Sequence, residues 1–284
     1  MEFRKIQLSD RECFEKALKP SDIFWEFSFS CLIVWNKDRT YVLKTENYML
    51  VYFELKDKYL FLPPYLYDEK YFGEAVSVAE MHAEDNGVKF IMRGLTEAQV
   101  AQLNGYNVTC KDSESDYIYS VKQLLELTGK KFHAKRNYVN RFVGKYNHSF
   151  REYTSDDYES AVNLCKKWLD NNENEALWEF EAIKSSLVLS KDLGLKIGLL
   201  FVGEKLVALS ISDIASNGVA HTLFEKGDLE YDGVYQTINY LTAKNILKDC
   251  EVVNRQEDMG IEGLRRAKLS YNPISIEKKY SITR

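Results

Sequence analysis

Three consecutive strand-like runs joined by short turns restrict the fold of this 284-residue chain more than any other feature. Residues 195–202, 205–214 and 219–226 are rich in side chains that favour strands. The turns between them contain Gly203-Glu204 and Asn217-Gly218, and short turns of this kind favour antiparallel hairpins. The second half of the chain therefore predicts a three-stranded antiparallel meander.

Helices and single strands surround this meander in a definite order. The predicted elements are helices at 155–170 and 175–193 before it, and a helix at 233–247, a strand at 251–254, a helix at 260–269 and a strand at 274–280 after it. This order, ααβββαβαβ, is similar to the layout of the Gcn5-related N-acetyltransferase (GNAT) fold. The likeness concerns topology, and topology alone does not fix the chemistry.

The first half of the chain has a similar mixture of elements. The predicted elements are strands at 39–44, 48–55, 58–62 and 88–92 and a helix at 71–85, while the aromatic-rich stretch 24–35 receives no assignment. We therefore expect an α/β (α+β) protein with two GNAT-like lobes, each a mixed, mostly antiparallel sheet flanked by helices. No clear internal sequence repeat is present, so a duplication of one lobe stays an open alternative.

Length and composition suggest two domains inside the cell. We expect lobes at residues 1–128 and 151–284, joined by a basic helical connector at 129–150. Five scattered cysteines without a CxxC pair favour reduced thiols, and no metal-ligand spacing occurs. The longest apolar runs are strand-length, so no transmembrane segment is expected. We expect a cytoplasmic protein, with peripheral attachment to the membrane as the alternative.

An acid-free basic segment stands out because the chain as a whole carries a formal net charge of -5. Residues 127–151 contain no Asp or Glu. The candidate substrate- or anion-binding residues of this segment are Lys130, Lys131, His133, Lys135, Arg136, Asn137, Asn140 and Arg141. Arginine and lysine bind phosphate in different ways, by a planar fork and by a point charge. The segment therefore favours anion binding over the alternative, an ordinary solvated face between two lobes.

Helical spacing separates this segment into two faces. If residues 131–146 form one helix, His133, Asn137, Asn140 and Arg141 fall near one face. Lys131, Lys135, Tyr138, Phe142 and Lys145 then fall near another face. The first face would bind a polar anion through directed hydrogen bonds.

A second constellation follows the predicted strand at 251–254. Gly260 and Gly263 allow close backbone approach, and Asp258 can cap the following helix. Lys268 ends that helix, where it can stabilise charge on a carbonyl oxygen during acyl transfer. The spacing alone favours the competing role, which is favourable interaction with the helix C-terminus.

A third candidate site is the start of the predicted helix at 233–247. Gly233 precedes this helix, whose first N–H groups could bind a phosphate or pyrophosphate. The stretch 229–235 has one glycine and two acidic residues, unlike the glycine-rich loop of acetyltransferases. This composition disfavours acyl-CoA as the ligand.

Two motifs together resemble a known family. LxGKKFHxKRNxxNxF at 127–142 and EDxGxEGLRxAKxSYxP at 257–273 are similar to the DUF2156 family, which is related to the C-terminal domain of phosphatidylglycerol lysyltransferases. The resemblance implies a tandem GNAT-like fold shared with Fem-type aminoacyltransferases, which move an aminoacyl group from a charged tRNA to an amine or a lipid hydroxyl. It implies that Lys268 stabilises the transferring carbonyl and that Asp258 and Arg265 shape its pocket. The basic segment would then contact tRNA phosphate or an anionic lipid head group.

Three hypotheses about function follow. The first is an acyltransferase that uses aminoacyl-tRNA as its donor substrate, with no permanently bound cofactor. The second is an acyl-CoA-dependent N-acetyltransferase. The third is a non-catalytic binding module that keeps the same fold.

Overall fold

The computed structural model describes residues 2–170 and 176–284, and these form two compact units. Unit 1 consists of residues 1–116, 257–262 and 276–284, and unit 2 of residues 117–256 and 263–275. The chain thus passes from one unit to the other four times, whereas the division expected from the sequence is linear. That residues 1–128 and 151–284 fold as independent domains stays a prediction.

Unit 1 is built on a mixed sheet with the strand order β1-β2-β3-β4-β6-β15-β7, and β5 pairs with β3. Its strands are β1 (Arg4–Lys5), β2 (Thr40–Lys44), β3 (Tyr48–Leu55), β4 (Lys58–Phe61), β5 (Tyr65–Leu66), β6 (Lys89–Leu95), β7 (Asn107–Cys110) and β15 (Tyr280–Thr283). Within the described part of this sheet, β4 and β6 run parallel and the other neighbours are antiparallel. The C-terminal strand β15 therefore completes the sheet of the N-terminal half.

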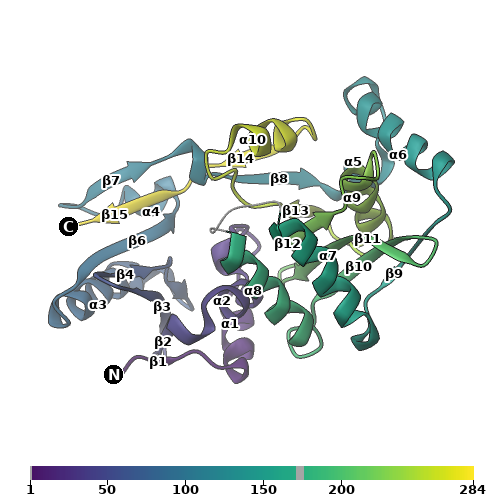
Figure 1. Ribbon diagram of the computed structural model, residues 1–284. Coiled ribbons are helices and arrows are strands. Elements are labelled where there is room, and N and C mark those ends of the chain that lie inside the picture. Colours follow the sequence, from purple (N-terminus) through teal and green to yellow (C-terminus); the bar gives the residue numbers. More distant parts are fainter. Residues whose placement is uncertain (1, 171–175) are drawn as a thin grey trace. The chain divides into compact units, whose positions relative to one another are not determined.

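The helices of unit 1 cover this sheet. They are α1 (Arg11–Ala17), α2 (Phe29–Asn36), α3 (Phe72–Asp85) and α4 (Glu97–Val100). Helix α3 packs on β3, β4 and β6 and contributes Ala75, Val76 and Ala79 to the core (Figure 1). All side chains from 48 to 53 in β3 are buried, so both faces of the sheet are covered.

Unit 2 contains a second mixed sheet with the strand order β14-β8-β13-β12-β11-β10-β9. Its strands are β8 (Asp116–Ser120), β9 (His148–Glu152), β10 (Lys196–Val202), β11 (Lys205–Ile214), β12 (Ala220–Gly227), β13 (Val252–Asn254) and β14 (Ser275–Glu277). The parallel pair is β12 and β13, which are in register only at Ala220 and His221. The rest of β12 continues without β13 as a partner, which leaves the end of β13 open to side chains from other elements.

Helices α5 (Val121–Glu126), α6 (His133–Lys145), α7 (Tyr158–Asp170), α8 (Ala176–Val188), α9 (Val234–Asn245) and α10 (Glu262–Leu269) accompany this second sheet. Helix α9 packs on β10, β11 and β12, and α6 packs on α9 (Figure 1). Phe142 of α6 joins Val207, Val234 and Ile238 in one apolar cluster. Hydrophobic burial therefore fixes α6 to the body of unit 2.

The expected fold class, two mixed and mostly antiparallel sheets flanked by helices, is confirmed. The strand predicted at 274–280 is wrong as a single element, because it is two strands that belong to different sheets. Between them Lys279 is buried among carboxylates, an environment that no local pattern predicts. Strand β9 was not predicted, and residue 175 of the helix predicted at 175–193 lies outside the described residues.

Candidate functional site

Helix α6 carries the acid-free segment on unit 2. The chain enters it through Gly129, whose φ of 80° lies in the left-handed region, and through a 3-10 turn over Lys130–Phe132. Phe132, Val139 and Phe142 are buried, and their spacing defines the inward side of the helix. The polar residues of the segment are thereby divided between an outward and an inward side.

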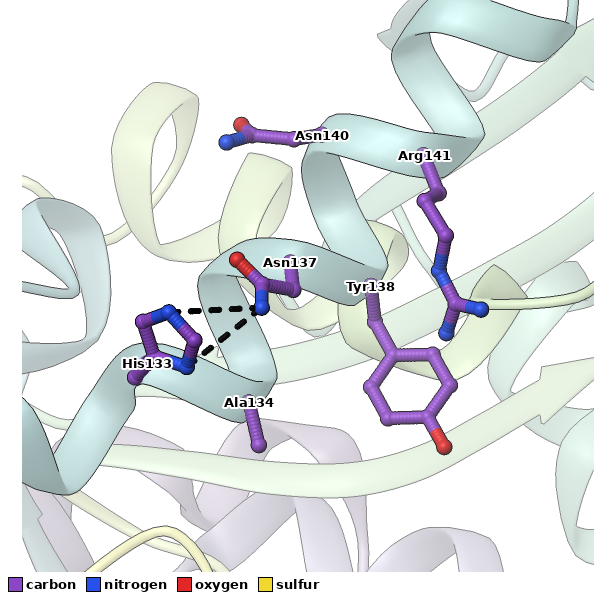
Figure 2. Close-up of a pocket in the computed structure, with 6 residues that line it drawn as sticks. All are labelled: His133, Ala134, Asn137, Tyr138, Asn140 and Arg141. Atoms are coloured by element: carbon purple, nitrogen blue, oxygen red, sulfur yellow. Dashed lines mark hydrogen bonds between the residues drawn. The ribbon is translucent and has the colours of Figure 1, made fainter.

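The outward side gathers the polar face that helical spacing predicts. His133, Asn137, Asn140 and Arg141, together with Ala134 and Tyr138, line a depression of about 580 Å³ (Figure 2). All six residues come from one helix, so the depression is an open surface and not a cleft. The Asn137 amide lies 3.4 Å from a ring nitrogen of His133, and the Arg141 guanidinium lies 4.6 Å from the centre of the Tyr138 ring. This surface offers several hydrogen-bond groups to an extended polar ligand.

Not every cation of the segment faces outward. Arg136 donates hydrogen bonds to the main-chain carbonyls of Leu127 and Gly129, so it closes the end of α5. Lys130 and Lys131 are exposed, and Lys131 donates to the Gln123 side chain at 3.1 Å. Arg141 lies 3.4 Å from Asp232, and both side chains are more than half exposed.

Lys135 points inward, on the same side as Val139 and Phe142. Its ammonium lies 4.1 Å from the centre of the Tyr271 ring, a cation–π contact. Burial, and then the nearby charge of Arg255, lower the pKa of Lys135 to about 8. Among the described residues it makes no ion pair with a carboxylate.

Arg255 follows β13 and forms the centre of a polar cluster in unit 2. Its guanidinium pairs with Glu225 of β12, which also accepts a hydrogen bond from Asn239 of α9 at 3.3 Å. The rings of Tyr119 and Tyr271 lie 5.6 and 5.0 Å from the guanidinium carbon. The single carboxylate of this cluster is therefore already engaged by Arg255 and Asn239.

Lys268 lies in the last turn of α10 and is buried, with 9% of its surface exposed. Its ammonium donates to the main-chain carbonyl of Arg255 and lies 5.7 Å from the Tyr117 ring. The hydroxyl of Tyr119 donates to the Lys268 carbonyl at 2.9 Å. The side chain is thus directed toward the end of β13, as a reacting group would be, and not only toward the carbonyls that end its own helix.

The loop before α10 holds Asp258 in a tight turn of unit 1. Asp258 is fully buried, and its carboxylate accepts a hydrogen bond from the Gly260 N–H at 2.8 Å. Met259 and Gly260 have φ values of 54° and 76°, so the turn needs the freedom of Gly260. Asp258 belongs to unit 1, whereas Lys268 belongs to unit 2.

The remaining candidates of this motif lie on α10. Arg265 is partly exposed on this helix. Gly263 has helical φ, and a Cβ there would meet open space. The described atoms therefore make no close approach at Gly263.

Gly233 begins α9 with a φ of 83°, and a neighbouring helix approaches it closely. A Cβ at this position would lie 2.8 Å from the carbonyl oxygen of Tyr138 in α6. The next N–H, of Val234, already donates to the Tyr231 carbonyl at 3.1 Å. The group that comes close to Gly233 is therefore the main chain of α6, which covers the helix start where a phosphate was expected.

The chain can now be compared with known proteins. The family model described as "Phosphatidylglycerol lysyltransferase, C-terminal" matches residues 24–283. This chain belongs to that family. An uncharacterized protein of Mycoplasmoides gallisepticum is 26% identical over 180 residues, which are 60% of this chain and 56% of that protein. The match thus spans little more than half the length of this relative.

Solved structures agree with the family. A conserved protein of unknown function from Bacteroides thetaiotaomicron has a TM-score of 0.92 at 30% identity, covering 100% of this chain and 99% of that one. L-PGS from Bacillus licheniformis has a TM-score of 0.71 at 14% identity, covering 97% and 92%. FemX, with 0.68 at 10% (99% and 97%), and a tandem GNAT protein from clavulanic acid biosynthesis, with 0.52 at 8% (99% and 98%), share the fold. The expected family and its tandem GNAT-like fold are confirmed.

Sequence reasoning missed part of the unit 2 cluster of this family member. Arg255 and Tyr119 were not singled out, although Tyr271 lies inside the second motif. Arg255 directly follows a predicted strand, and that position was the available signal. Within residues 2–170 and 176–284, no group of three His, Cys, Asp or Glu residues could hold a metal ion. No helix in the same ranges is long and apolar enough to cross a membrane.

Proposed function

We propose that this chain is an aminoacyltransferase that takes its aminoacyl group from a charged tRNA and gives it to an amine or to a lipid head-group hydroxyl. The observation that carries the proposal is the buried Lys268 at the end of β13, in the same unit as an acid-free helix. Membership of the phosphatidylglycerol lysyltransferase family supports the same reaction class.

The outward side of α6 would hold the donor. Lys130, Lys131 and Arg141 supply positive charge there, and His133, Asn137 and Asn140 supply hydrogen-bond groups. Phosphate contacts of this kind position a nucleic acid without reading its sequence. An anionic lipid head group is the other partner that this charge suits, and it would be reached from the membrane surface.

Lys268 would act on the ester carbonyl of the donor. The acceptor nitrogen or oxygen forms a bond to the carbonyl carbon, and the ester bond to the ribose oxygen breaks. The proton that the acceptor loses ends on that ribose oxygen. A charged lysine beside the carbonyl lowers the barrier because negative charge develops on the carbonyl oxygen in the transition state. In this proposal Arg265, which belongs to unit 2 like Lys268, shapes the pocket.

The main competing function is transfer from acyl-CoA. In that reaction the start of α9 would bind the pyrophosphate of the cofactor. The main chain of α6 lies against Gly233, and Arg141 pairs with Asp232 at the same place. This covering disfavours acyl-CoA as the donor. A rise in melting temperature with acetyl-CoA would favour it again, because a ligand of the native state stabilises that state.

Two experiments test the proposal. In the first, charged tRNA is bound at several salt concentrations to the wild type and to the double variant Lys130→Glu and Arg141→Glu. The variant should bind more weakly and with a shallower salt dependence, because two cations no longer displace counterions. Lys191→Glu, an exposed lysine outside the segment, is the matched control. Equal binding by the double variant and the wild type contradicts the role of α6.

In the second experiment, transfer of a radiolabelled aminoacyl group to amines and to anionic lipid vesicles is measured with Lys268→Met. Loss of one group that stabilises an oxyanion lowers the rate roughly 10²–10³-fold. Lys248→Met, an exposed lysine beyond α9, should keep the wild-type rate. A wild type that transfers nothing, or a Lys268→Met variant that transfers normally, contradicts the enzymatic proposal. The first result favours the binding-module hypothesis.

A further inference from the structure

Lys135 is a half-buried cation of unit 2. Moving a charge out of water is unfavourable unless a partner of opposite charge compensates it. Lys135 forms no ion pair with a carboxylate among the described residues. Its ammonium lies 4.1 Å from the centre of the Tyr271 ring, which offers only weak compensation.

A second cation increases this imbalance. Arg255 approaches the same Tyr271 ring, at 5.0 Å, and is close enough to lower the pKa of Lys135. The carboxylate of Glu225 is bound by Arg255 itself and by Asn239. Two cations therefore lie near one tyrosine ring, while the carboxylate of Glu225 on β12 pairs with only Arg255 of these two.

We infer that Lys135, Arg255 and Tyr271 form an anion subsite that takes a single phosphoryl group. Lys135 would bind the phosphate as a point charge, and the outer N–H groups of Arg255 would add directed hydrogen bonds. Part of the Arg255 side chain, 14%, stays exposed, so a ligand can reach it. The subsite lies on the inward side of α6 and is separate from the open face of His133 and Asn137.

The subsite gives the donor or acceptor a fixed phosphate position near the proposed reacting lysine. Tyr271 is the second residue after α10, and its N–H donates to the Lys268 carbonyl at 3.1 Å. Lys268 donates in turn to the carbonyl of Arg255. A phosphate on Lys135 and Arg255 would thus be held by the residues that also position Lys268. The inference rests on the proposed function for its physiological ligand, but not for the binding itself.

The test is an NMR titration of the full chain with inorganic phosphate. The variants are Lys135→Met, Lys135→Arg and, as a control outside the segment, Lys248→Met, which changes an exposed lysine. Loss of a charge-assisted hydrogen bond should weaken phosphate binding by about tenfold or more in Lys135→Met. Lys135→Arg and Lys248→Met should stay near the wild-type affinity. Unchanged binding in Lys135→Met, an equal loss in Lys248→Met, or no phosphate binding by the wild type overturns the inference.

The side-chain titration of Lys135 gives a second readout that does not depend on activity. The charged and titratable groups around it are Arg255 with its partner Glu225, Tyr271, and Lys131 in the 3-10 turn before α6. Bound phosphate should raise the pKa of Lys135 above its ligand-free value, because a nearby anion favours the charged amine. A titration curve that phosphate does not move contradicts the subsite.

Two further probes distinguish the source of the phosphate. One is glycerophosphoglycerol, a diester that represents a lipid head group, and the other is a short single-stranded RNA that ends in a 3′-adenosine. The probe whose affinity Lys135→Met lowers more identifies the occupant. Failure of aminoacyl transfer with intact phosphate binding would reject the proposed function and leave the subsite standing, and the reverse result would reject the subsite alone.

Discussion

The two units each place a lysine out of full contact with water, but they treat its charge in opposite ways. In unit 1, Lys279 is 1% exposed and donates to Glu26, Asp116 and Glu257 at 2.9, 2.9 and 3.0 Å. These carboxylates raise the pKa of Lys279 despite its burial. In unit 2, Lys135 has Tyr271 and Arg255 as neighbours, and its pKa falls to about 8. The partners, and not burial alone, decide whether a buried lysine is structural or available to a ligand.

In each unit a helix lies in the chain between the two parallel strands, and the N-terminal ends of these two helices differ. Helix α3 of unit 1 begins at Phe72, and a Cβ on Gly73 would meet open space. Helix α9 of unit 2 begins at Gly233, against the main chain of α6. The start of α9 thus lies against α6, whereas the start of α3 has open space at Gly73. In the proposed function, the chemistry lies beside β13 and α6.

The largest expected effect is on the lysine of unit 1. Lys279→Met should lower the free energy of unfolding by about 3–5 kcal/mol, because three carboxylates lose a buried partner. Urea denaturation measures the change. Lys278→Met, at an exposed neighbouring position, should have little effect. A loss below about 1 kcal/mol would mean that the ionic cluster is not structural, and the contrast with Lys135 would fail.

A smaller loss is expected at the start of α9. Gly233→Ala should cost about 1–3 kcal/mol of stability, since the new Cβ would lie 2.8 Å from the Tyr138 carbonyl and the residue has a φ of 83°. The matched change in unit 1, Gly73→Ala, should be neutral or stabilise by up to about 1 kcal/mol. Thermal denaturation of both variants measures the difference. Equal effects would show that α6 does not constrain the start of α9.

Glu26 makes the cluster of unit 1 sensitive to pH. Burial first, and neighbouring carboxylates after it, raise the pKa of Glu26 from 4.5 to about 7 against the opposing charge of Lys279. The folded state therefore holds this proton more tightly than the unfolded state, so stability should fall as pH rises from 4.5 to about 7. Glu26→Gln should remove this fall, which amounts to at most about 3 kcal/mol. Burial alone would raise the pKa of Glu257, but the charges of Lys279 and Arg93 lower it below 4.5. Glu257 therefore affects stability at a lower pH than Glu26 does. If stability falls equally with pH in the wild type and in Glu26→Gln, another group causes the fall.

The smallest effect should have the opposite sign. Lys135→Met should stabilise the chain, by less than about 1 kcal/mol because the side chain is partly exposed. The folded pKa of about 8 lies below the ordinary 10.5, so the stabilisation should be full below pH 8 and disappear by about pH 10.5. Urea denaturation at pH 7 and at pH 10.5 measures it. Destabilisation at pH 7 would show that the contact with Tyr271 is structural and would remove the contrast with Lys279.

Much of the local structure could be predicted from the sequence. The predicted strand at 48–55 has the bounds of β3, and the helix predicted at 71–85 is α3 preceded by one residue. The hairpins of β10, β11 and β12 follow from two short turns, because such turns leave antiparallel pairing as the simplest arrangement. The outward polar face of α6 follows from helical spacing in the same way. Each of these features depends on residues that are close together in the chain.

The tertiary structure alone decided which distant segments meet. Strand β15 joins the sheet of unit 1, and Lys279 beside it finds Glu26 at a separation of 253 residues. The inward direction of Lys135 likewise depends on the packing of Phe142 against α9 and on Tyr271, far along the chain. A local pattern tells which side chains avoid water, but the sign and distance of the charges around them arise only when remote segments pack together. For this reason the sequence could predict a basic helix, and only the fold could separate its outward face from its single inward lysine.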